Sequence, residues 1–575
     1  MIRVPKKDIF RQRTVEVTVF LLFAFAIVAA KLYVLQVVHG PQARLAAENQ
    51  HSIYQKIFPS RGEIFLTDRD TDELLPVAVN IKKYLVYAVP PEIKDATGTA
   101  EKLEPILGMA ATDILPKLLQ ADRKYVPIKK QLTEEEQQRL KGSELAGIYL
   151  DSEDSRFYPQ QNLLSQVVGF YGYKGNAKAG LYGLERYFEK DLAGQAGELH
   201  EEKDTNGAWI FGSDRRITPA QDGTNLILTV DKNIQFKAES VLKDTVAKHG
   251  ADSGSVIVVD PKTGAVLAMA NYPDFNPNEY NKTEDPKVFM NDATMGNYEP
   301  GSVFKPLTMA AAIDEGKVTP DTTYEDTGTV VIDNYPIKNS DLKAHGTQTM
   351  TQVLELSLNT GAIFAKDQIG NAEFFKYVKK FGFGKETGIE LPEMVGNLDN
   401  LKADIKVNYA TASFGQGISV TPIQMIQAFT ALANEGKMMR PFIVKAEVSA
   451  NGKTKLTEPK VVEQVVSAKT ANMVTAMLVN VVENGHGKKA GVPGYYIAGK
   501  TGTAQVPKKD GRGYEPNNNI GSFIGYGPVE NPRFLMLVRI NHPRDVTFAE
   551  STAAPAFGEL AQFILNYYHI PPTRK

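Results

Sequence analysis

The chain contains no cysteine, which excludes a disulfide framework and thiolate metal sites. Its eight histidines show none of the spacings that bind zinc. The formal net charge is −2, so no overall positive field points to a nucleic acid partner. No internal repeat stands out. After one apolar segment near the N-terminus there is no second long apolar run, so the chain is expected to cross a membrane once.

The apolar segment extends from Val17 to Val38 and carries one charge, Lys31. About 20 apolar residues are enough to cross a bilayer. Basic residues precede the segment: Arg3, Lys6, Lys7, Arg11 and Arg13. This flank predicts a cytoplasmic tail over 1–14, a transmembrane anchor over 15–38 and an extracytoplasmic remainder. A cleaved signal peptide is the alternative, because the uncharged part of the segment is short.

At 575 residues the chain is too long for one ordinary domain, and its 42% hydrophobic and 23% charged residues are typical of globular proteins. Residues 39–225 alternate short apolar runs with charged turns and show no catalytic pattern. The short apolar runs between turns predict strands over 64–66, 84–89 and 147–150, and helical periodicity predicts helices over 101–119 and 134–140.

The pattern changes at 225–230, a predicted strand followed by a helix that Asp231 caps and Gly250 ends. The span 290–490 reads as mostly helical. Further strands are expected over 255–259, 265–270, 495–498, 522–526 and 534–540, with a closing helix over 557–568. Residues 226–575 are therefore predicted to form an α/β domain. In it, strands from both ends make one antiparallel sheet, and a helical lobe is inserted between them.

The pattern S-x-x-K occurs three times, beginning at Ser240, Ser302 and Ser340. Ser240 lies on the solvated face of a predicted helix, and Ser340 lies in a predicted loop. Ser302 follows Pro-Gly and opens an apolar helical run, so its hydroxyl lies near free backbone N–H groups, and Lys305 lies one turn later on the same side. A helix-capping serine with an incidental lysine is the alternative for this pair.

The patterns K-T-G and S-x-N each occur twice. Residues 262–264 follow Asp-Pro and are typical of a hairpin turn, whereas Lys500, Thr501 and Gly502 extend a predicted strand. A glycine on such a strand lets a substrate backbone approach its edge. Residues 449–451 belong to a turn, whereas Ser357-Leu-Asn359 is expected within a helix that begins near Thr349. The alternative for Ser357 and Asn359 is that they form a cap at a helix end.

Taken in order, S-x-x-K, S-x-N and K-T-G describe a serine acyl-transfer site. With them the chain resembles the class B penicillin-binding proteins, close to the division-type (septal) peptidoglycan transpeptidases. Residues 61–64 resemble the pedestal signature of that family, and residues 180–185 resemble a conserved pedestal segment. Residues 254–271 and 414–424 are also similar to it. The middle residue of S-x-N is Leu358, where the family often has serine or aspartate, and no appended wall-binding repeats are expected after Lys575.

The resemblance implies a transpeptidase (penicillin-binding) domain over 226–575 on a dimerisation (pedestal) domain over 39–225. It implies that Ser302 attacks the D-Ala-D-Ala end of a stem peptide and that Lys305, with a depressed pKa, is its base. The backbone N–H groups of Ser302 and Thr503 would hold the oxyanion. The remaining implied site residues are Ser357 as proton relay, Asn359 on the substrate amide, and Lys500, Thr501, Gly502 and Thr503 at the substrate carboxylate.

The family needs no metal and no organic cofactor. The partners it implies are peptidoglycan stem peptides, β-lactams as covalent inhibitors, the membrane, and a polytopic membrane glycosyltransferase of the shape and division type. An elongation-type transpeptidase, a D,D-carboxypeptidase or β-lactamase, and a non-catalytic scaffold or β-lactam sensor are the alternatives. The intact Ser302, Lys305 and Lys500 disfavour a scaffold, and the long pedestal and anchor disfavour a small secreted lactamase.

Overall fold

The computed structural model describes residues 6–40, 52–71, 73–175, 177–202, 216–508 and 513–574. The chain forms two compact units. The first comprises Met1–Ser60 and Gly194–Asp222, and the second comprises Arg61–Ala193 and Gly223–Lys575.

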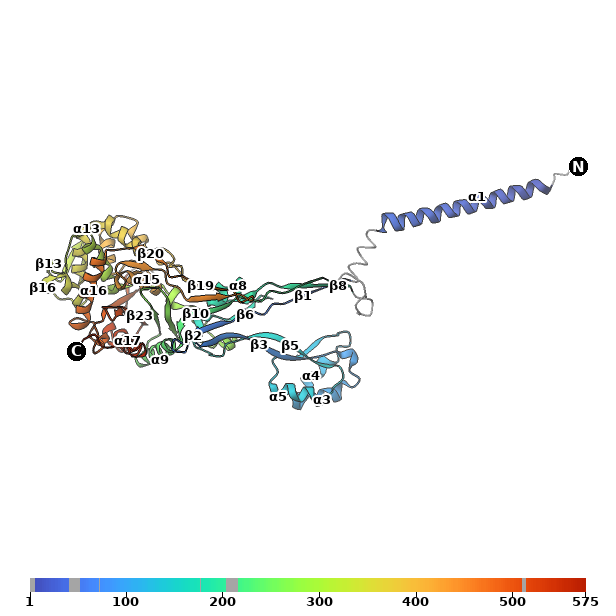
Figure 1. The fold of residues 1–575 in the computed structure, drawn as a ribbon, viewed down its shortest axis with the longest axis horizontal. Coiled ribbons are helices and arrows are strands. Elements are labelled where there is room, and N and C mark those ends of the chain that lie inside the picture. Colours follow the sequence, from blue (N-terminus) through green and yellow to red (C-terminus); the bar gives the residue numbers. More distant parts are fainter. Residues whose placement is uncertain are drawn as a thin grey trace. The chain divides into compact units, whose positions relative to one another are not determined.

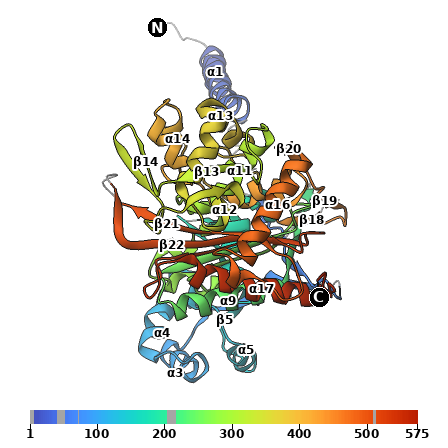
Figure 2. The ribbon, with the colours of Figure 1, turned by 90° about the vertical axis from the view of Figure 1, so that its left-hand side faces the viewer.

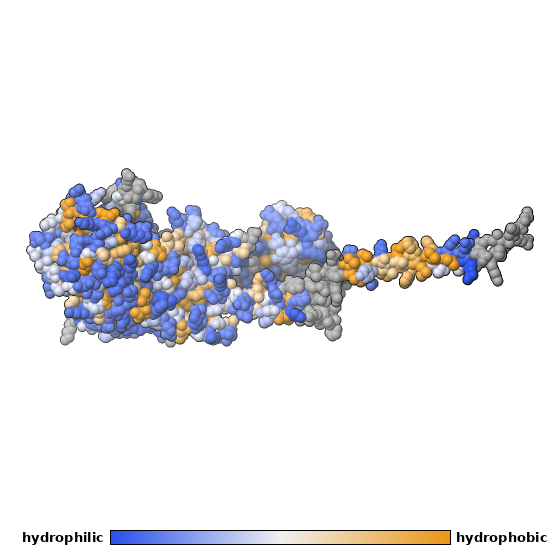
Figure 3. All heavy atoms as spheres, turned by 90° about the horizontal axis from the view of Figure 1, so that it is seen from above, coloured by the Kyte–Doolittle hydropathy of each residue, from blue (hydrophilic) through white to orange (hydrophobic). Residues whose placement is uncertain are grey.

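The first unit contains the N-terminal helix and a small sheet. Helix α1 spans Lys6–Tyr33 and continues as the π-helical turn η1 over Val34–Val38. Within the described ranges this is the one helix long and apolar enough to cross a membrane, and its apolar side chains are exposed (Figure 3). It is therefore consistent with a single-pass anchor. Strands β1 (Ser52–Ile57), β8 (Gly197–Glu202) and β9 (Arg216–Thr218) form an antiparallel sheet in the order β1-β8-β9.

The second unit begins with a seven-stranded sheet (Figure 1). Its strands are β2 (Ile64–Thr67), β3 (Leu74–Ala88), β4 (Val126–Lys129), β5 (Ile148–Phe157), β10 (Asn225–Asp231), β18 (Val444–Val448) and β19 (Thr454–Leu456). Strand β10 pairs in parallel with β2 and antiparallel with β18. The strand expected to open the second domain thus joins the sheet of the pedestal, because its partners come from both parts of the sequence.

One end of this sheet is covered by three helices: α3 (Ala96–Leu107), α4 (Ala111–Leu118) and α5 (Glu134–Lys141). The prediction of a single helix over 101–119 is wrong, because two helices, α3 and α4, cover this span. Gly108, at φ +60°, ends α3 in the left-handed conformation that glycine adopts without strain. Helix α5 begins at a capping box formed by Thr133 and Glu136.

Two segments that resemble the family's pedestal meet in a buried ion pair. The side chain of Glu185 is fully buried, and it accepts hydrogen bonds from Arg61 Nε (2.8 Å) and Arg156 Nε (2.6 Å). Burial alone would raise the pKa of Glu185, but the charges of Arg156 and Arg61 hold it below its ordinary value. Arg61 and Glu185, which are 124 positions apart in the sequence, are thereby held together.

Replacing Glu185 with alanine should destabilise the second unit by about 3–5 kcal/mol, because two arginine charges would lose their buried partner. Denaturant unfolding of the detergent-solubilised protein measures this loss. The matched control is Glu135→Ala, since Glu135 pairs with Arg139 at the surface with 74% and 54% of the two side chains exposed, and the unfolding midpoint should not move. A loss below about 1 kcal/mol for Glu185→Ala would contradict the prediction.

The rest of the second unit is built on a five-stranded antiparallel sheet in the order β12-β11-β23-β22-β21. The bounds are β11 (Ser253–Val259), β12 (Val266–Tyr272), β21 (Ala498–Pro507), β22 (Tyr514–Gly527) and β23 (Phe534–Asn541). Strands from the two ends of this part of the sequence pair directly, as predicted. The strand expected over 495–498 begins only at Ala498, so K-T-G lies inside β21 and does not follow it.

Helices cover both faces of this sheet (Figure 2). One face carries α9 (Lys232–Lys248), with Asp231 as N-cap as predicted, and α17 (Ala553–Tyr567). The other carries the helical lobe: α11 (Lys305–Asp314), α12 (Met350–Glu355), α13 (Asn359–Lys380), α14 (Lys406–Ala412), α15 (Pro422–Ala433) and α16 (Ala468–Glu483). Two-stranded antiparallel sheets interrupt the lobe: β13 (Thr323–Asp326) with β16 (Gly346–Thr349), β14 (Thr329–Ile332) with β15 (Tyr335–Lys338), and β17 (Lys437–Met439) with β20 (Val461–Gln464).

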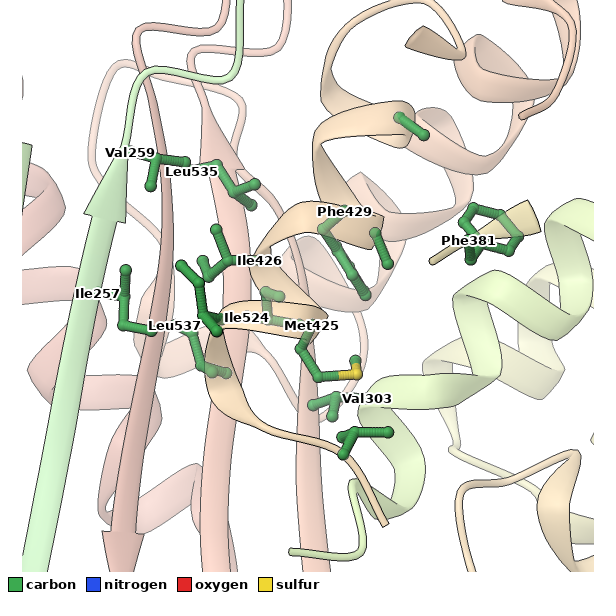
Figure 4. Close-up of a cluster of buried hydrophobic side chains, with 14 of the residues drawn as sticks. Ile257, Val259, Val303, Phe381, Met425, Ile426, Phe429, Ile524, Leu535 and Leu537 are labelled. Atoms are coloured by element: carbon green, nitrogen blue, oxygen red, sulfur yellow. The ribbon is translucent and has the colours of Figure 1, made fainter. Parts of the chain in front are cut away.

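The sheet has a buried apolar layer on each face because side chains alternate along its strands. Ile257 and Val259 of β11 point toward the lobe with Leu535 and Leu537 of β23, where they meet α15 at Ile426 (Figure 4). The intervening side chains face α9 and α17. A sheet buried on both faces is a rigid base for the strand that carries K-T-G.

Candidate active site

Ser302 lies in a tight turn that packs closely against Gly415. The 3₁₀ turn η5 spans Gly301–Phe304 and leads into α11, so Ser302 stands at a helix start as predicted. Gly301 N donates to Gly415 O (2.9 Å), and a Cβ on Gly415 would lie 2.2 Å from Gly301 O. No larger residue fits at 415. This contact explains why the segment over 414–417 accompanies the S-x-x-K motif.

Strand β21 presses on the other side of this turn. A Cβ on Gly502 would lie 2.9 Å from Val303 Cγ1 and 2.7 Å from Ser522 Oγ. The glycine of K-T-G is therefore needed for close packing of the strand against the serine turn. Thr501 is buried and Thr503 half-buried, and Thr503 Oγ1 accepts a hydrogen bond from Ala549 N (3.2 Å).

Ser357 lies between two helices, and the expectation that it sits within one is wrong. Helix α12 ends at Glu355 and α13 begins at Asn359. Ser357 has φ +58°, a left-handed conformation that a non-glycine residue adopts only when its surroundings hold it there. The hydroxyl of Ser357 therefore projects from the turn that joins α12 to α13.

The structure brings two buried lysines from distant segments to this hydroxyl. Lys305 Nζ donates to Ser357 Oγ (3.2 Å) and to the Ser357 carbonyl, and Lys500 Nζ donates to Ser357 Oγ (2.9 Å). Lys305 is 1% exposed and Lys500 is 0% exposed. Ser302 is half-buried. Among the described residues, the side chain of Lys305 is hydrogen bonded to Ser357 and not to Ser302.

Burial depresses the pKa of both amines, and the charge of Lys500 acts in addition on Lys305. Burial is the main cause of the lowered pKa of Lys305, and the charge of Lys500 lowers it further, well below the ordinary 10.5. Burial lowers the pKa of Lys500 to about 7. Because neutral amines accept protons, this pair can take a proton from a serine hydroxyl near neutral pH.

Asn359 is the first residue of α13 and lies half-buried at the same turn. Its Nδ2 donates to Lys338 O at the end of β15 (2.8 Å), while its Oδ1 accepts no hydrogen bond from the described residues. The side-chain oxygen is thus available to an amide N–H. Within the described residues, no group of three or more His, Asp or Glu side chains could hold a metal ion.

The duplicate motifs lie elsewhere, as predicted. Ser240 is on α9, on the opposite face of the sheet from the lobe. Ser340 and Lys343 are exposed in the turn after β15. Residues 262–264 form the turn between β11 and β12, with Gly264 at φ +86°.

Sequence reasoning missed a buried polar group behind the S-x-N turn. Asp326, Asn339 and Thr360 are each at most 2% exposed and are hydrogen bonded to one another. It missed Glu299 too, which accepts hydrogen bonds from Gly417 N (3.0 Å) and Tyr514 OH (3.0 Å). No motif marks these residues, since single acidic or amide side chains in polar stretches carry no spacing signal.

A serine at a helix start, two buried amines of lowered pKa and a sheet strand that closes on the serine turn define a serine acyltransferase. Two family models match the sequence: the penicillin binding protein transpeptidase domain over residues 254–562 and the penicillin-binding protein dimerisation domain over residues 56–228. The chain belongs to the class B penicillin-binding proteins, and its activity is that of a serine D,D-transpeptidase of peptidoglycan.

Relatives resemble the chain over nearly its whole length. Stage V sporulation protein D of Bacillus subtilis is 34% identical over 98% of this chain and 87% of its own. The peptidoglycan D,D-transpeptidase FtsI of Escherichia coli is 31% identical over 96% and 91%. The crystal structure of penicillin binding protein 3 from Mycobacterium tuberculosis, complexed with aztreonam, is 27% identical with a TM-score of 0.69, covering 90% of this chain and 99% of that one.

Proposed function

We propose that Ser302 is the nucleophile and Lys305 its base. The observation that carries this proposal is the convergence of Lys305, Ser357 and Lys500 around one hydroxyl. Ser302 Oγ attacks the carbonyl carbon of the penultimate D-alanine of a stem peptide, and its proton passes to neutral Lys305. The C–N bond then breaks, and Ser357 relays the proton to the leaving D-alanine amine. The amine of a second stem peptide attacks the acyl-enzyme, forms the cross-link and releases Ser302.

Three further contacts complete the proposed site. The backbone N–H groups of Ser302 and Thr503 hold the developing oxyanion, a geometry favoured by the close packing of β21 on the serine turn. Asn359 binds the substrate amide through its available oxygen. Lys500, Thr501 and Thr503 bind the terminal carboxylate, whereas Gly502 allows the strand to pack against the serine turn and does not make room for the substrate.

The same site is proposed to take β-lactams as covalent inhibitors, since a relative of this fold is known complexed with aztreonam. Labelling of the protein with a fluorescent penicillin, followed by peptide mapping, tests the whole assignment. The label should be on Ser302. A label on any other serine would contradict the proposal.

For the cellular role we propose cross-linking of septal wall during division, supported by similarity to FtsI. The similarity to stage V sporulation protein D favours a sporulation role as the second candidate. A fluorescently tagged copy in the native cells separates the two. Enrichment at the division site of growing cells supports the first, and appearance only during spore formation supports the second.

We further propose that the N-terminus is cytoplasmic, that residues 39–225 form the pedestal and that residues 226–575 form the catalytic domain outside the membrane. The basic residues before the apolar segment support this orientation. A polytopic glycosyltransferase is the proposed membrane partner, contacted through the apolar face of Val17–Val38 and through the pedestal around 61–68.

Replacing Val17–Val38 with an unrelated spanning helix should leave penicillin labelling unchanged, because the anchor lies in a different compact unit from the site residues. The exchange should nonetheless abolish growth support in cells that lack the native protein, because the proposed partner contact is lost. Colony counts after depletion measure this. Full support by the exchanged protein would mean that the anchor is a tether and that recognition lies in the pedestal.

A further inference from the structure

A single buried carboxylate joins four segments behind the S-x-N turn. Asp326 closes β13 and is 1% exposed. Its Oδ1 accepts hydrogen bonds from Thr360 Oγ1 (2.7 Å) and Gly328 N (3.0 Å). Its Oδ2 accepts from Asn339 Nδ2 (2.9 Å) and His345 N (3.1 Å). A buried carboxylate surrounded by donors fixes their positions, because any displaced donor would lose its acceptor away from water.

Asn339 carries this constraint to the first turn of α13. Its amide nitrogen donates to Asp326, and its Oδ1 accepts from Asn359 N (2.9 Å) and Thr360 N (3.3 Å). The first N–H groups of a helix have no acceptor within the helix and are usually satisfied by the side chain of the N-cap residue.

The N-cap residue of α13 is Leu358, whose apolar side chain is buried in the main core and makes no cap hydrogen bond. This is the middle residue of the S-x-N motif. The helix start is therefore capped by a side chain from elsewhere, Asn339, and the position of Asn339 depends on Asp326.

We propose that Asp326 and Asn339 are a positioning pair that supplies the cap that Leu358 cannot, and so holds Ser357 and Asn359 in register with the two lysines. The proposal rests on the proposed function, because it assigns Asn359 to the substrate amide and Ser357 to proton transfer. Neither Asp326 nor Asn339 touches substrate. Their effect is on geometry, to which acyl transfer is sensitive at a displacement of about 1 Å.

The pair can be exchanged chemically. Asp326→Asn turns an amide nitrogen toward donors, and Asn339→Asp places two carboxylates against each other in a buried site, so each single variant should break the contact. The double variant Asp326→Asn/Asn339→Asp restores one donor and one acceptor between the two positions. It keeps the acceptors for Thr360, Gly328 and α13. It loses the bond from His345 N and the bond that Asn339 Nδ2 donates to Lys343 O (3.2 Å).

The chain offers a matched control for both substitutions. Asp333 and Asn334 form the turn between β14 and β15, are exposed and both have positive φ, which aspartate and asparagine tolerate. Asp333→Asn and Asn334→Asp make the same chemical changes in the same part of the lobe, and they should leave acylation unchanged.

The experiment measures the acylation rate of the full-length, detergent-solubilised protein with benzylpenicillin and with 6-aminopenicillanic acid, which lacks the side-chain amide. The acylation rate of each single variant with benzylpenicillin should fall by about 10- to 100-fold, because Asn359 no longer meets the amide. With 6-aminopenicillanic acid the factor by which the rate falls should be about ten times smaller. The double variant should recover at least tenfold over either single variant. Thermal unfolding of every variant accompanies the rates.

Equal losses of acylation rate with the two substrates, together with a lowered unfolding temperature, would show a folding defect alone and overturn the proposal. Equal losses with an unchanged unfolding temperature would overturn the part of the proposal that concerns Asn359. Single variants within twofold of wild type, or a double variant that shows the product of the two losses, would also overturn it. A failure of the proposed function is distinguishable, because the penicillin label of the wild-type protein would then lie away from Ser302.

Discussion

Replacing Ser302 with alanine should abolish covalent labelling by a fluorescent penicillin, with a loss of at least about a thousandfold in the acylation rate. The acyl-enzyme is an ester of the serine Oγ, and Ser302 stands at a helix start whose turn packs against β21. Ser357 accepts hydrogen bonds from both amines and lies between helices. Gel fluorescence after a time course measures the loss.

The duplicate motifs provide the controls. Ser240→Ala and Ser340→Ala remove the serines of the other two S-x-x-K copies, which lie on α9 and in an exposed turn. Both variants should label at the wild-type rate. Labelling retained by Ser302→Ala, or lost in either control, would refute the assignment of the nucleophile.

Lys305→Arg should be nearly as inactive as Lys305→Ala, with both reduced by about a thousandfold or more. Arginine keeps the positive charge but remains protonated in proteins, so it cannot accept the serine proton. Lys305 and Lys500 are at most 1% exposed, so the permanent charge of an arginine at 305 would be buried beside Lys500. Stopped-flow acylation of the purified protein measures the rates.

The pH dependence of wild-type acylation gives an independent check. The neutral form of Lys305 is the proposed base, and its pKa is well below 10.5. The rate should therefore rise with pH through this lowered pKa and fall as the solution is acidified below it. Lys343→Arg, in the exposed duplicate motif, should match wild type at every pH. A Lys305→Arg rate within tenfold of wild type would mean that the residue acts only as a positive charge.

Much of the architecture follows from local pattern. Short apolar runs bounded by turn residues predict β11, β12 and β23, and Asp231 predicts the start of α9, because local composition and capping determine such elements. The pattern alone does not predict which strand is the partner of another, and β10 pairs with the pedestal strand β2. It also missed a local stop, because Gly108 ends α3 within a span expected to be one helix.

By itself the sequence determined which S-x-x-K, S-x-N and K-T-G copies belong together, since order and local context distinguish them from the duplicates. It determined the class of protein and the apolar N-terminal helix for the same reason. Only the tertiary structure decided how the residues meet. The left-handed turn at Ser357, the burial that lowers the pKa of both lysines, and the cap that Asn339 and Asp326 give α13 all arise between distant segments. Such contacts leave no periodic trace along the chain, because they depend on which surfaces are brought together on folding.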